Sequence, residues 1–291
     1  RDRVFDTKKS EFLIRQMRRV YHRTIQTLTE QVKRGQFRPE GYEVAFSAAN
    51  HLDAVQFVLS DEEKMHLRGR IDRVDTYTAN GKVYVKIIDY KTGNTNFQLV
   101  NLYHGLQLQL VVYLNAALEV TKQKHPKQEV LPAGIFYYHV DDPYIEGRAG
   151  MSPEEIGEAM LEQLKLDGIV SNEEEVYRAM DVDMGSASSI IPVKLKKDGS
   201  LSAVSKTLSN TAFSNIGNYV QQKIQSLGED MMGGNVAAEP YLQENKSGCD
   251  FCSYRSVCGF DEKIPGYGYR RLDKKMKDEE ILQKISEKGG E

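Results

Sequence analysis

Three charged residues lie at the ends of two apolar, β-branched stretches of the sequence. Asp72 falls within residues 69–75, and Asp89 and Lys91 end the stretch of residues 82–91. Residues two apart on an extended strand point to the same face, so Asp89 and Lys91 would share one. A carboxylate beside apolar neighbours needs a cation or hydrogen bonds, and a hard divalent ion such as Mg²⁺ prefers carboxylate oxygens. The two aspartates could therefore hold a divalent metal ion beside a phosphodiester.

A polar pair on the following helix supports this hypothesis. Gln109 and Tyr113 are four residues apart, so they share one face of the helix predicted over residues 106–120. In this interpretation both side chains reach the cleft that contains Asp89. The alternative is a surface ion pair at a strand end, beside a core helix with two incidental polar residues, because an isolated Asp-x-Lys occurs by chance in many chains.

The periodicity of the whole chain predicts an α/β sheet with helices packed on it. Alternation and turn residues favour strands over residues 43–49, 65–75, 82–91 and 133–140. Helical spacing favours helices over residues 10–34, 106–120, 154–164, 172–180 and 209–231, and Asp198-Gly199 favours a hairpin between 190–195 and 201–204. In the first helix, steps of three and four residues predict a buried stripe of Ile14, Met17, Tyr21, Ile25, Leu28 and Val32.

The composition is that of an ordinary globular protein, with 40% hydrophobic and 28% charged residues. No apolar run is long enough to span a bilayer and no signal peptide is visible, so we expect a cytoplasmic chain that does not enter a membrane. The chain begins at Arg1, so we also expect a fragment or a processed chain. The net charge is −3, but residues 1–40 carry eleven Lys or Arg against five Asp or Glu. That excess indicates either a solvated helix face or a contact to the DNA backbone.

All three cysteines, Cys249, Cys252 and Cys258, lie within ten residues. An odd number at this spacing is unsuited to a disulfide framework, and in a cytosolic chain it favours a metal or cluster site. Four thiolates are the usual complement of an Fe–S cluster, so three leave such a site incomplete. The spacing disfavours the alternative of three unrelated buried cysteines.

Several of these stretches resemble the RecB-like branch of the PD-(D/E)XK nucleases. They are Gly69–Asp75, Asp89–Gly93 and Gln109–Tyr113, and the Gln-x-x-x-Tyr of the last one marks that branch. Ile135–Val140 and Cys249–Cys258 are similar to the C-terminal region of AddB-like subunits of the bacterial AddAB helicase–nucleases. The resemblance covers nearly the whole chain, with the motifs in the family's order.

The resemblance implies a mixed central sheet flanked by helices, with additional helices and a C-terminal cysteine-rich segment. Residues 1–265 would form the nuclease domain, with a core at about 40–140 and the cysteine-rich segment at 249–258. Residues 266–291 would be a charged C-terminal tail.

The resemblance also implies the roles of individual residues. The catalytic set would be Asp72, Asp89, Lys91, Gln109 and Tyr113. Asp72, Asp89 and the Tyr90 backbone carbonyl would bind Mg²⁺ or Mn²⁺, and Lys91 would be the catalytic lysine. Glu43 would match an acidic position upstream in the family. The implied activity is a metal-dependent DNA exonuclease of double-strand break repair by recombination, with DNA and an AddA-like helicase subunit as partners.

The sequence departs from the family pattern at two ligands. AddB-like chains carry a Gly-x-x-x-His helix and a fourth cysteine upstream, and neither occurs here, while His22 lies in an unlike context. We therefore expect weak metal affinity and an incomplete site for the 4Fe–4S cluster of the full-length protein, with the cluster lost, zinc bound or the thiols reduced. No ATP-binding loop motif is present. Two alternatives remain, a catalytically silent DNA-end-binding and cluster-bearing module and a CRISPR-associated nuclease of the same fold.

Overall fold

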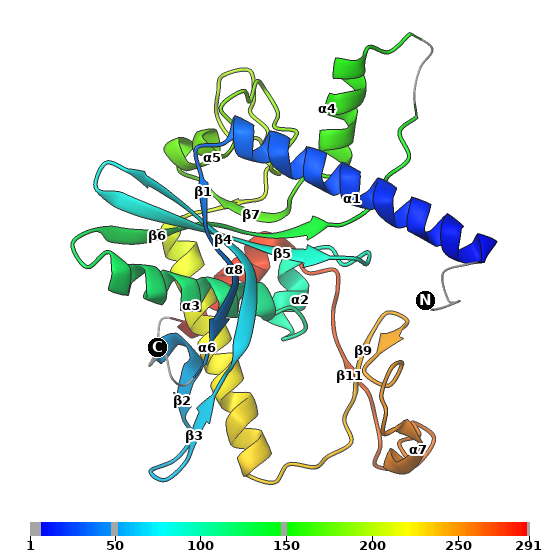
Figure 1. Cartoon of the computed structure of the whole chain (residues 1–291). Helices are drawn as coiled ribbons and strands as arrows, with labels where there is room; N and C mark the ends of the chain where they lie inside the picture. The colour runs from blue at the N-terminus through cyan, green and yellow to red at the C-terminus, as the bar shows by residue number, and fades with distance from the viewer. Residues whose placement is uncertain (1–6, 48–51, 147–149, 290–291) are drawn as a thin grey trace, which may run out of the picture.

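The computed structural model describes residues 7–47, 52–146 and 150–289. Its centre is a six-stranded sheet in the order β1-β4-β5-β6-β7-β8 (Figure 1). The strands are β1 (Arg38–Phe46), β4 (Gly69–Ala79), β5 (Lys82–Lys91), β6 (Glu129–His139), β7 (Asp167–Ser171) and β8 (Thr207–Leu208). The sheet contains both parallel and antiparallel pairs, which confirms the predicted α/β class with a mixed sheet.

The strands β4 and β5 form a hairpin that leads directly into a crossover. Asn80 and Gly81 make its turn with φ of 50° and 76°, a conformation that Asn-Gly adopts readily. β5 then pairs in parallel with β6, and a parallel pair needs a long connection, here α2 (Leu99–Tyr103) and α3 (Gln109–Lys124). The carboxyl ends of β5 and β6 consequently lie side by side, with Lys91 paired to His139.

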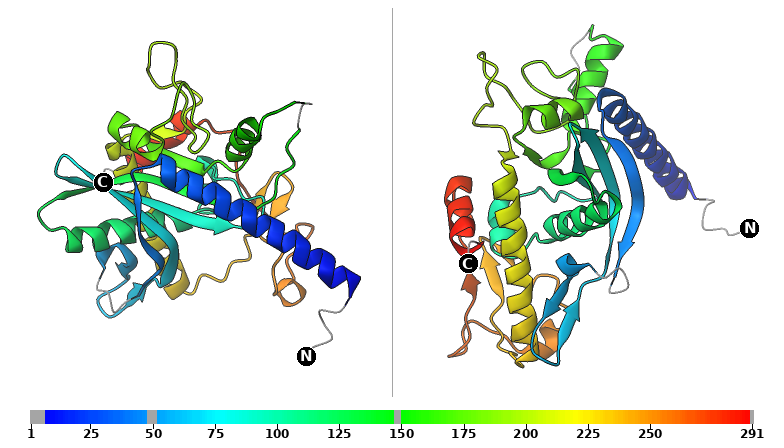
Figure 2. Two further views of the ribbon diagram at one scale, coloured as in Figure 1. Left: turned by 45° about the horizontal axis from the view of Figure 1, so that its top comes forward. Right: turned by 90° about the vertical axis from the view of Figure 1, so that its left-hand side faces the viewer.

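Helices cover both faces of the sheet, and each face has its own hydrophobic cluster. The helices α3, α6 (Asn210–Met232) and α8 (Asp278–Gly289) lie over one face, and α1 (Lys8–Arg34), α4 (Pro153–Gln163) and α5 (Glu174–Met180) lie over the other (Figure 2). The central strand β5 feeds both clusters, because Val85 and Ile87 point to the first and Tyr84 and Ile88 to the second. A strand covered on both faces fixes its register firmly, since a slip of one residue would exchange the two sets.

The stripe predicted to be buried along α1 is largely exposed. Met17 is 70% exposed, Tyr21 65% and Ile25 45%, so the prediction is wrong for these three residues. The N-terminal half of α1 extends past the edge of the sheet, and the C-terminal half contacts the body, with Leu28 against the second cluster (Figure 1). Helical periodicity identified an apolar face correctly but could not show what covers it.

Several element boundaries differ from the sequence prediction. The helix predicted from residue 106 begins at Gln109, and the strand predicted over 65–75 is divided between β3 (Lys64–His66) and β4. The hairpin predicted around residues 198–199 is represented by an isolated bridge between Leu195 and Leu201. β7, β8 and β2 (Gln56–Val58), which follows a 3-10 turn at Asp53–Val55, were not predicted, and residues 48–49 of the strand predicted over 43–49 lie outside the described residues.

The C-terminal part combines a small sheet with a helix that joins the core. β9 (Tyr241–Gln243) pairs with β10 (Lys246–Ser247) and β11 (Arg270–Arg271), and the short α7 (Arg255–Cys258) lies in the cysteine-rich segment. In α8, Ile281 and Ile285 are fully buried in the first cluster. Within the described part of the chain, no helix has both the length and the apolar character that a bilayer crossing requires.

Candidate active site

The two aspartates lie opposite each other at the ends of β4 and β5. Arg73 pairs with Ile88, and continuing this antiparallel register by one residue places Asp72 opposite Asp89. The Asp72 carboxylate accepts a hydrogen bond of 2.8 Å from the backbone N–H of Tyr90. Both carboxylates therefore lie at the same end of the β4–β5 pair, and this hydrogen bond links Asp72 to the strand that carries Asp89.

The first turn of α3 completes a hydrogen-bonded network around Asp89. Gln109 Nε2 donates to Asp89 Oδ1 at 3.0 Å and to the Tyr113 hydroxyl at 2.9 Å. Lys91 Nζ donates to Gln109 Oε1 at 3.1 Å and lies 2.6 Å from Asp89 Oδ2. Leu110 and Leu114 are buried against the sheet and hold α3 in place, so Gln109 and Tyr113 face the aspartate. The structure thus brings the five predicted catalytic residues to one place.

The environment of this network disfavours a bare negative charge. Asp89 is 2% exposed, and burial, with the nearby charge of Asp72, raises its pKa, although Lys91 opposes that rise. Lys91 Nζ also lies 5.2 Å from the centre of the Tyr137 ring, a cation–π distance. Burial, with the charge of Asp89, raises the pKa of Tyr137 to about 12, so this ring stays neutral. Asp89 is therefore poised to gain from an added cation.

The donor set suits a hard divalent ion with few protein ligands. Asp72 and Asp89 offer carboxylate oxygens, the ligand type that Mg²⁺ and Mn²⁺ prefer. Nowhere in residues 7–47, 52–146 and 150–289 do three or more His, Cys, Asp or Glu side chains gather in a way that could hold a metal ion. An ion at this edge would depend on the two aspartates, backbone oxygen and water.

Two residues weighed from the sequence do not join the network. Glu43 follows Tyr42, which pairs with Arg73, so it lies beside Asp72 in the β1–β4 register. Its backbone is left-handed with φ 50°, and its carboxylate turns outward to Arg70 at 3.1 Å. His22 is exposed on α1. Neither side chain supplies a further ligand to the aspartate pair.

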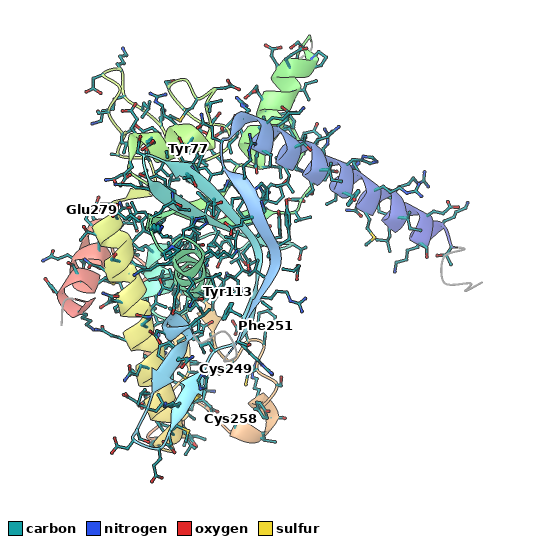
Figure 3. All side chains as sticks on the ribbon, turned by 60° about the vertical axis from the view of Figure 1, so that its left-hand side comes forward. Tyr77, Tyr113, Cys249, Phe251, Cys258 and Glu279 are labelled. Carbon is teal, nitrogen blue, oxygen red and sulfur yellow. The ribbon has the colours of Figure 1, made fainter. Side chains whose placement is uncertain are left out.

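The cysteines do not gather into a ligand set either. All three are free, with Cys249 half-buried and Cys252 and Cys258 exposed in the segment that carries Phe251 (Figure 3). Phe251 is fully exposed, so its ring does not build an apolar core around the thiols. The three thiols as placed here do not fit an Fe–S cluster or zinc.

Sequence reasoning missed a histidine beside Lys91. His139 ends β6 in register with Lys91, and its Nδ1 lies 3.0 Å from the carbonyl oxygen of Gly93. A 300 Å³ cavity adjoins Lys91 and His139 and is lined mainly by the polar loop of residues 92–96 and by residues 140–143. Ile135 and Tyr137 point to the Asp89 face, and parity along β6 puts residue 139 there too, so the alternation was the available signal.

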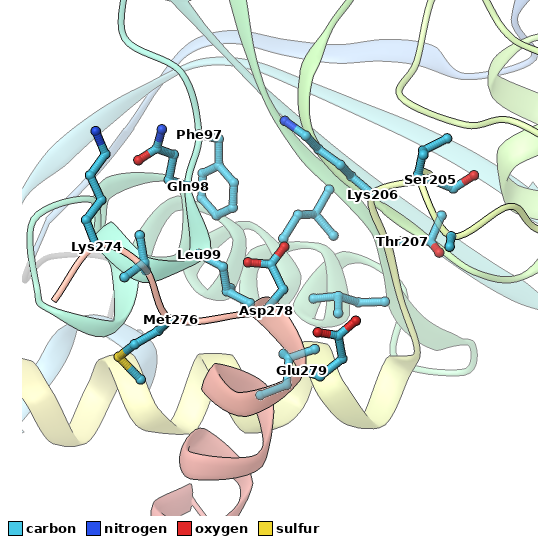
Figure 4. A pocket seen from close by; sticks show the side chains of 16 residues that line it. Phe97, Gln98, Leu99, Ser205, Lys206, Thr207, Lys274, Met276, Asp278 and Glu279 are labelled. Atoms are coloured by element: carbon cyan, nitrogen blue, oxygen red, sulfur yellow. The ribbon is translucent and has the colours of Figure 1, made fainter.

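A larger cavity of 660 Å³ lies away from the aspartates. It opens between residues 203–208, the segment before and within α2, and the start of α8 (Figure 4). Its lining mixes apolar groups with Lys206, Lys274, Asp278 and Glu279 and includes none of the predicted catalytic residues. Cavity volume alone would therefore not have located the acidic pair.

The fold and the site together define a class of enzyme. An acidic pair and a lysine at adjacent strand ends of a mixed sheet, with a Gln-x-x-x-Tyr helix beside them, are found in a chain whose residues 1–259 match the PD-(D/E)XK nuclease superfamily. The chain belongs to this superfamily, whose members generally use divalent metal ions.

Three curated relatives share the name of one kind of nuclease subunit. The chain is 36% identical, over 97% of its length, to an ATP-dependent helicase/deoxyribonuclease subunit of Alkaliphilus oremlandii. It is 38% identical, over 96% of its length, to the protein of the same name from Lachnoclostridium phytofermentans, and 38% identical, over 92%, to that from Clostridium tetani. These alignments cover 24%, 24% and 23% of the relatives, so the chain spans about a quarter of their length.

Proposed function

We propose that this chain is the nuclease domain of an AddB-like helicase–nuclease subunit and hydrolyses DNA phosphodiester bonds with Mg²⁺ or Mn²⁺. The observation that carries the proposal is the network in which Gln109 and Lys91 both contact Asp89, opposite Asp72. The names of the relatives, a helicase/deoxyribonuclease subunit, support the choice of DNA as substrate. Double-strand break processing as the setting is what the family resemblance implies.

The aspartates would hold the ion together with the Tyr90 backbone carbonyl. When bound, a divalent ion supplies polarisation of the scissile phosphate and a lower pKa for its water. Asp72 is already oriented by the Tyr90 N–H, and Asp89 by Gln109, so little side-chain ordering is needed. This orientation supports a site formed before substrate arrives.

Lys91 and Gln109 would act on the attacking water and the developing charge. Lys91 is 26% exposed in its side chain, so its ammonium group can reach substrate while it remains paired with Asp89. Next to the scissile group it would orient the water and offset negative charge in the transition state, without any covalent enzyme intermediate. Gln109 orients Lys91 and Asp89 through its two amide atoms, and Tyr113 fixes Gln109.

Partners and domain limits are part of the same proposal. The word subunit in the relatives' names supports an AddA-like helicase partner. Because Ile281 and Ile285 pack in the first cluster, we extend the nuclease domain expected over residues 1–265 to include α8. The family resemblance implies that Cys249, Cys252 and Cys258 are three ligands of a 4Fe–4S cluster. Their placement here does not fit that cluster, so no step of hydrolysis is assigned to it.

Cleavage of linear DNA tests the proposal. With Mg²⁺ or Mn²⁺, the chain should release nucleotides from linear duplex DNA, a chelator should stop the release, and Asp89→Ala should abolish it. Asp61→Ala, which removes an exposed carboxylate outside the network, is the matched control and should cleave as the parent does. Cleavage that survives Asp89→Ala would refute the assignment, and salt-sensitive binding without cleavage under either metal would favour a binding module instead.

A further inference from the structure

Three charged side chains are buried together behind the candidate active site. Arg73, Asp75 and Lys86 point to the sheet face opposite Asp72 and Asp89, and their side chains are 5%, 0% and 10% exposed. Arg73 and Asp75 belong to the same Gly69–Asp75 stretch as Asp72, yet the proposed hydrolysis uses neither. Buried charges are costly, and equally large apolar residues in their place are often neutral or stabilising. Stability alone therefore does not explain why three charged side chains are buried here.

Ion pairs within the cluster link the neighbouring strands β4 and β5. Arg73 Nε and Nη2 donate to the two oxygens of Asp75 at 2.6 and 2.8 Å, a bidentate arrangement. Lys86 Nζ, on β5, lies 2.9 Å from Asp75 Oδ2. Burial would raise the pKa of Asp75, but Lys86 and Arg73 outweigh burial and lower it, so the carboxyl stays ionised. Asp75 therefore links two cations from adjacent strands.

One aromatic ring lies beside each of the two cations. Lys86 Nζ lies 5.0 Å from the centre of the Phe37 ring, and the Arg73 guanidinium carbon lies 6.0 Å from the centre of the Tyr42 ring on β1. Phe37 is buried, and a cation–π contact such as that with Lys86 strengthens where water is excluded, whereas Tyr42 is an exposed residue. The cluster thus connects β1, β4 and β5 at the level of the aspartates.

Tyr90 connects this cluster with the catalytic face. Arg73 pairs with Ile88, so Arg73 and Tyr90 are diagonal neighbours on the same face of the β4–β5 pair. Burial raises the pKa of the Tyr90 hydroxyl, and the Arg73 guanidinium beside it opposes that rise. The Tyr90 ring also packs edge-on against Tyr138, with centroids 5.8 Å apart. Its main-chain N–H holds the Asp72 carboxylate on the other face, and its neighbours in sequence are Asp89 and Lys91. A movement of the Tyr90 backbone would therefore move both aspartates relative to each other.

We propose that Arg73, braced by Asp75 and Lys86, holds the Tyr90 hydroxyl and thereby sets the spacing of the Asp72 and Asp89 carboxylates for a divalent cation. Arg73 and Tyr90 are positioning residues, because they act through the Tyr90 main chain. The proposal rests on the proposed function, since it concerns the same metal. This proposal gives a role to Arg73 and Asp75, the charged residues of the Arg-Val-Asp that follows Asp72, which the proposed hydrolysis does not use.

Mn²⁺ binding without DNA is the test, measured by calorimetry alongside thermal unfolding. Tyr90→Phe should weaken Mn²⁺ binding by about tenfold, the scale typical of residues that orient metal ligands. Tyr77→Phe is the matched control, because Tyr77 lies on β4 and packs against Phe37 and Tyr84, and it should bind Mn²⁺ as the parent does. Arg73→Lys keeps the charge but loses the bidentate fork, so it should weaken binding at least as much.

A merely structural role predicts a different pattern. Tyr90→Phe would then lower the unfolding temperature without changing Mn²⁺ affinity relative to Tyr77→Phe, and that result would overturn the proposal even if Arg73→Lys failed to fold. With DNA present, positioning predicts a higher Mn²⁺ concentration for half-maximal cleavage at unchanged KM for DNA. If the parent chain binds no Mn²⁺, the proposed function fails as well, whereas unchanged affinity in Tyr90→Phe defeats this inference alone.

Discussion

Gln109 is the residue through which the network of the site is connected. Its amide contacts Asp89, Lys91 and Tyr113, yet the residue itself is exposed. Gln109→Met, which keeps the length and removes the hydrogen bonds, should lower kcat by roughly 10- to 100-fold while the unfolding temperature stays nearly constant. Gln123→Met on the exposed face of the same helix is the control and should leave kcat unchanged. Equal kcat in the two variants would contradict a catalytic role for the amide.

Tyr113 is linked to Asp89 through Gln109. Its hydroxyl accepts a hydrogen bond from Gln109, while its ring packs against Phe46 with centroids 5.8 Å apart. Tyr113→Phe keeps the ring and leaves both contacts of Gln109 with Asp89 and Lys91, so kcat should fall less than in Gln109→Met. Single-turnover cleavage rates compare the two variants directly. A larger loss in Tyr113→Phe would mean that the hydroxyl itself touches DNA.

The raised pKa of Asp89 has a consequence for the stability of the metal-free chain. A carboxyl whose pKa is higher in the folded state favours folding when protonated, and that contribution is lost as pH rises through the folded pKa. Ionised Asp89 therefore costs stability at neutral pH. Asp89→Asn should raise the unfolding temperature at pH 7 in chelator by roughly 2–4 °C, on the order of 1 kcal/mol. The difference should shrink as the pH falls through the raised pKa of the folded state towards the ordinary aspartate value of 3.8, and a less stable Asn variant at pH 7 would contradict this sign.

Spacing along the sequence could predict which residues meet at the site, but not how their neighbours behave. Two-residue and four-residue steps place Asp89 with Lys91 and Gln109 with Tyr113 in any strand and any helix. Glu43 shows the limit, because a left-handed backbone at φ 50° turns its side chain away from the register position beside Asp72. By contrast, the register that pairs Asp75 with Lys86 follows from the Asn80-Gly81 turn, whereas the burial of both side chains depends on the elements that cover that face of the sheet, which local sequence does not specify.

At the scale of elements, α8 is a core helix within a charged stretch. Ile281 and Ile285 are fully buried, although the stretch around them is rich in Lys and Glu. Ile281→Ala should lower the free energy of unfolding by about 2–5 kcal/mol, because it leaves a cavity against the first cluster. Gln283→Ala, on the exposed side of α8, should change it by less than about 0.5 kcal/mol. Chemical denaturation of both variants tests the difference, and equal stability would separate α8 from the core.

The helices and strands that sequence could not predict are those defined by distant partners. β5 was predicted with its observed bounds because its own residues alternate and Asn80-Gly81 starts it. β7 and β8 are short, and they exist because each pairs with a strand far away in sequence. The same reason explains α1, whose apolar face was evident while its exposure depends on how far the helix extends past the sheet.

At the scale of the whole molecule, charge is distributed unevenly around the site. The net charge is −3, but residues 8–29 of α1 hold six Lys or Arg and one Glu. Arg19 and Arg23 form ion pairs with Asp142, which follows the end of β6. The basic half of α1 is thereby held next to the carboxyl ends of β5 and β6, where Lys91 lies.

Salt dependence of DNA binding tests whether α1 takes part. Neutralising phosphates releases counterions, so each lost contact lowers the slope of log K against log salt by about 0.9 on duplex DNA. Arg15 and Arg18 are exposed, and changing both to Gln should reduce the slope by roughly 1–2 and weaken binding at low salt. Lys196→Gln with Lys197→Gln, on an exposed turn, removes the same charge and should leave the slope unchanged. Anisotropy titrations in chelator measure binding without cleavage, and equal slopes for the two double variants would mean that α1 is a solvated helix whose arginines do not contact DNA.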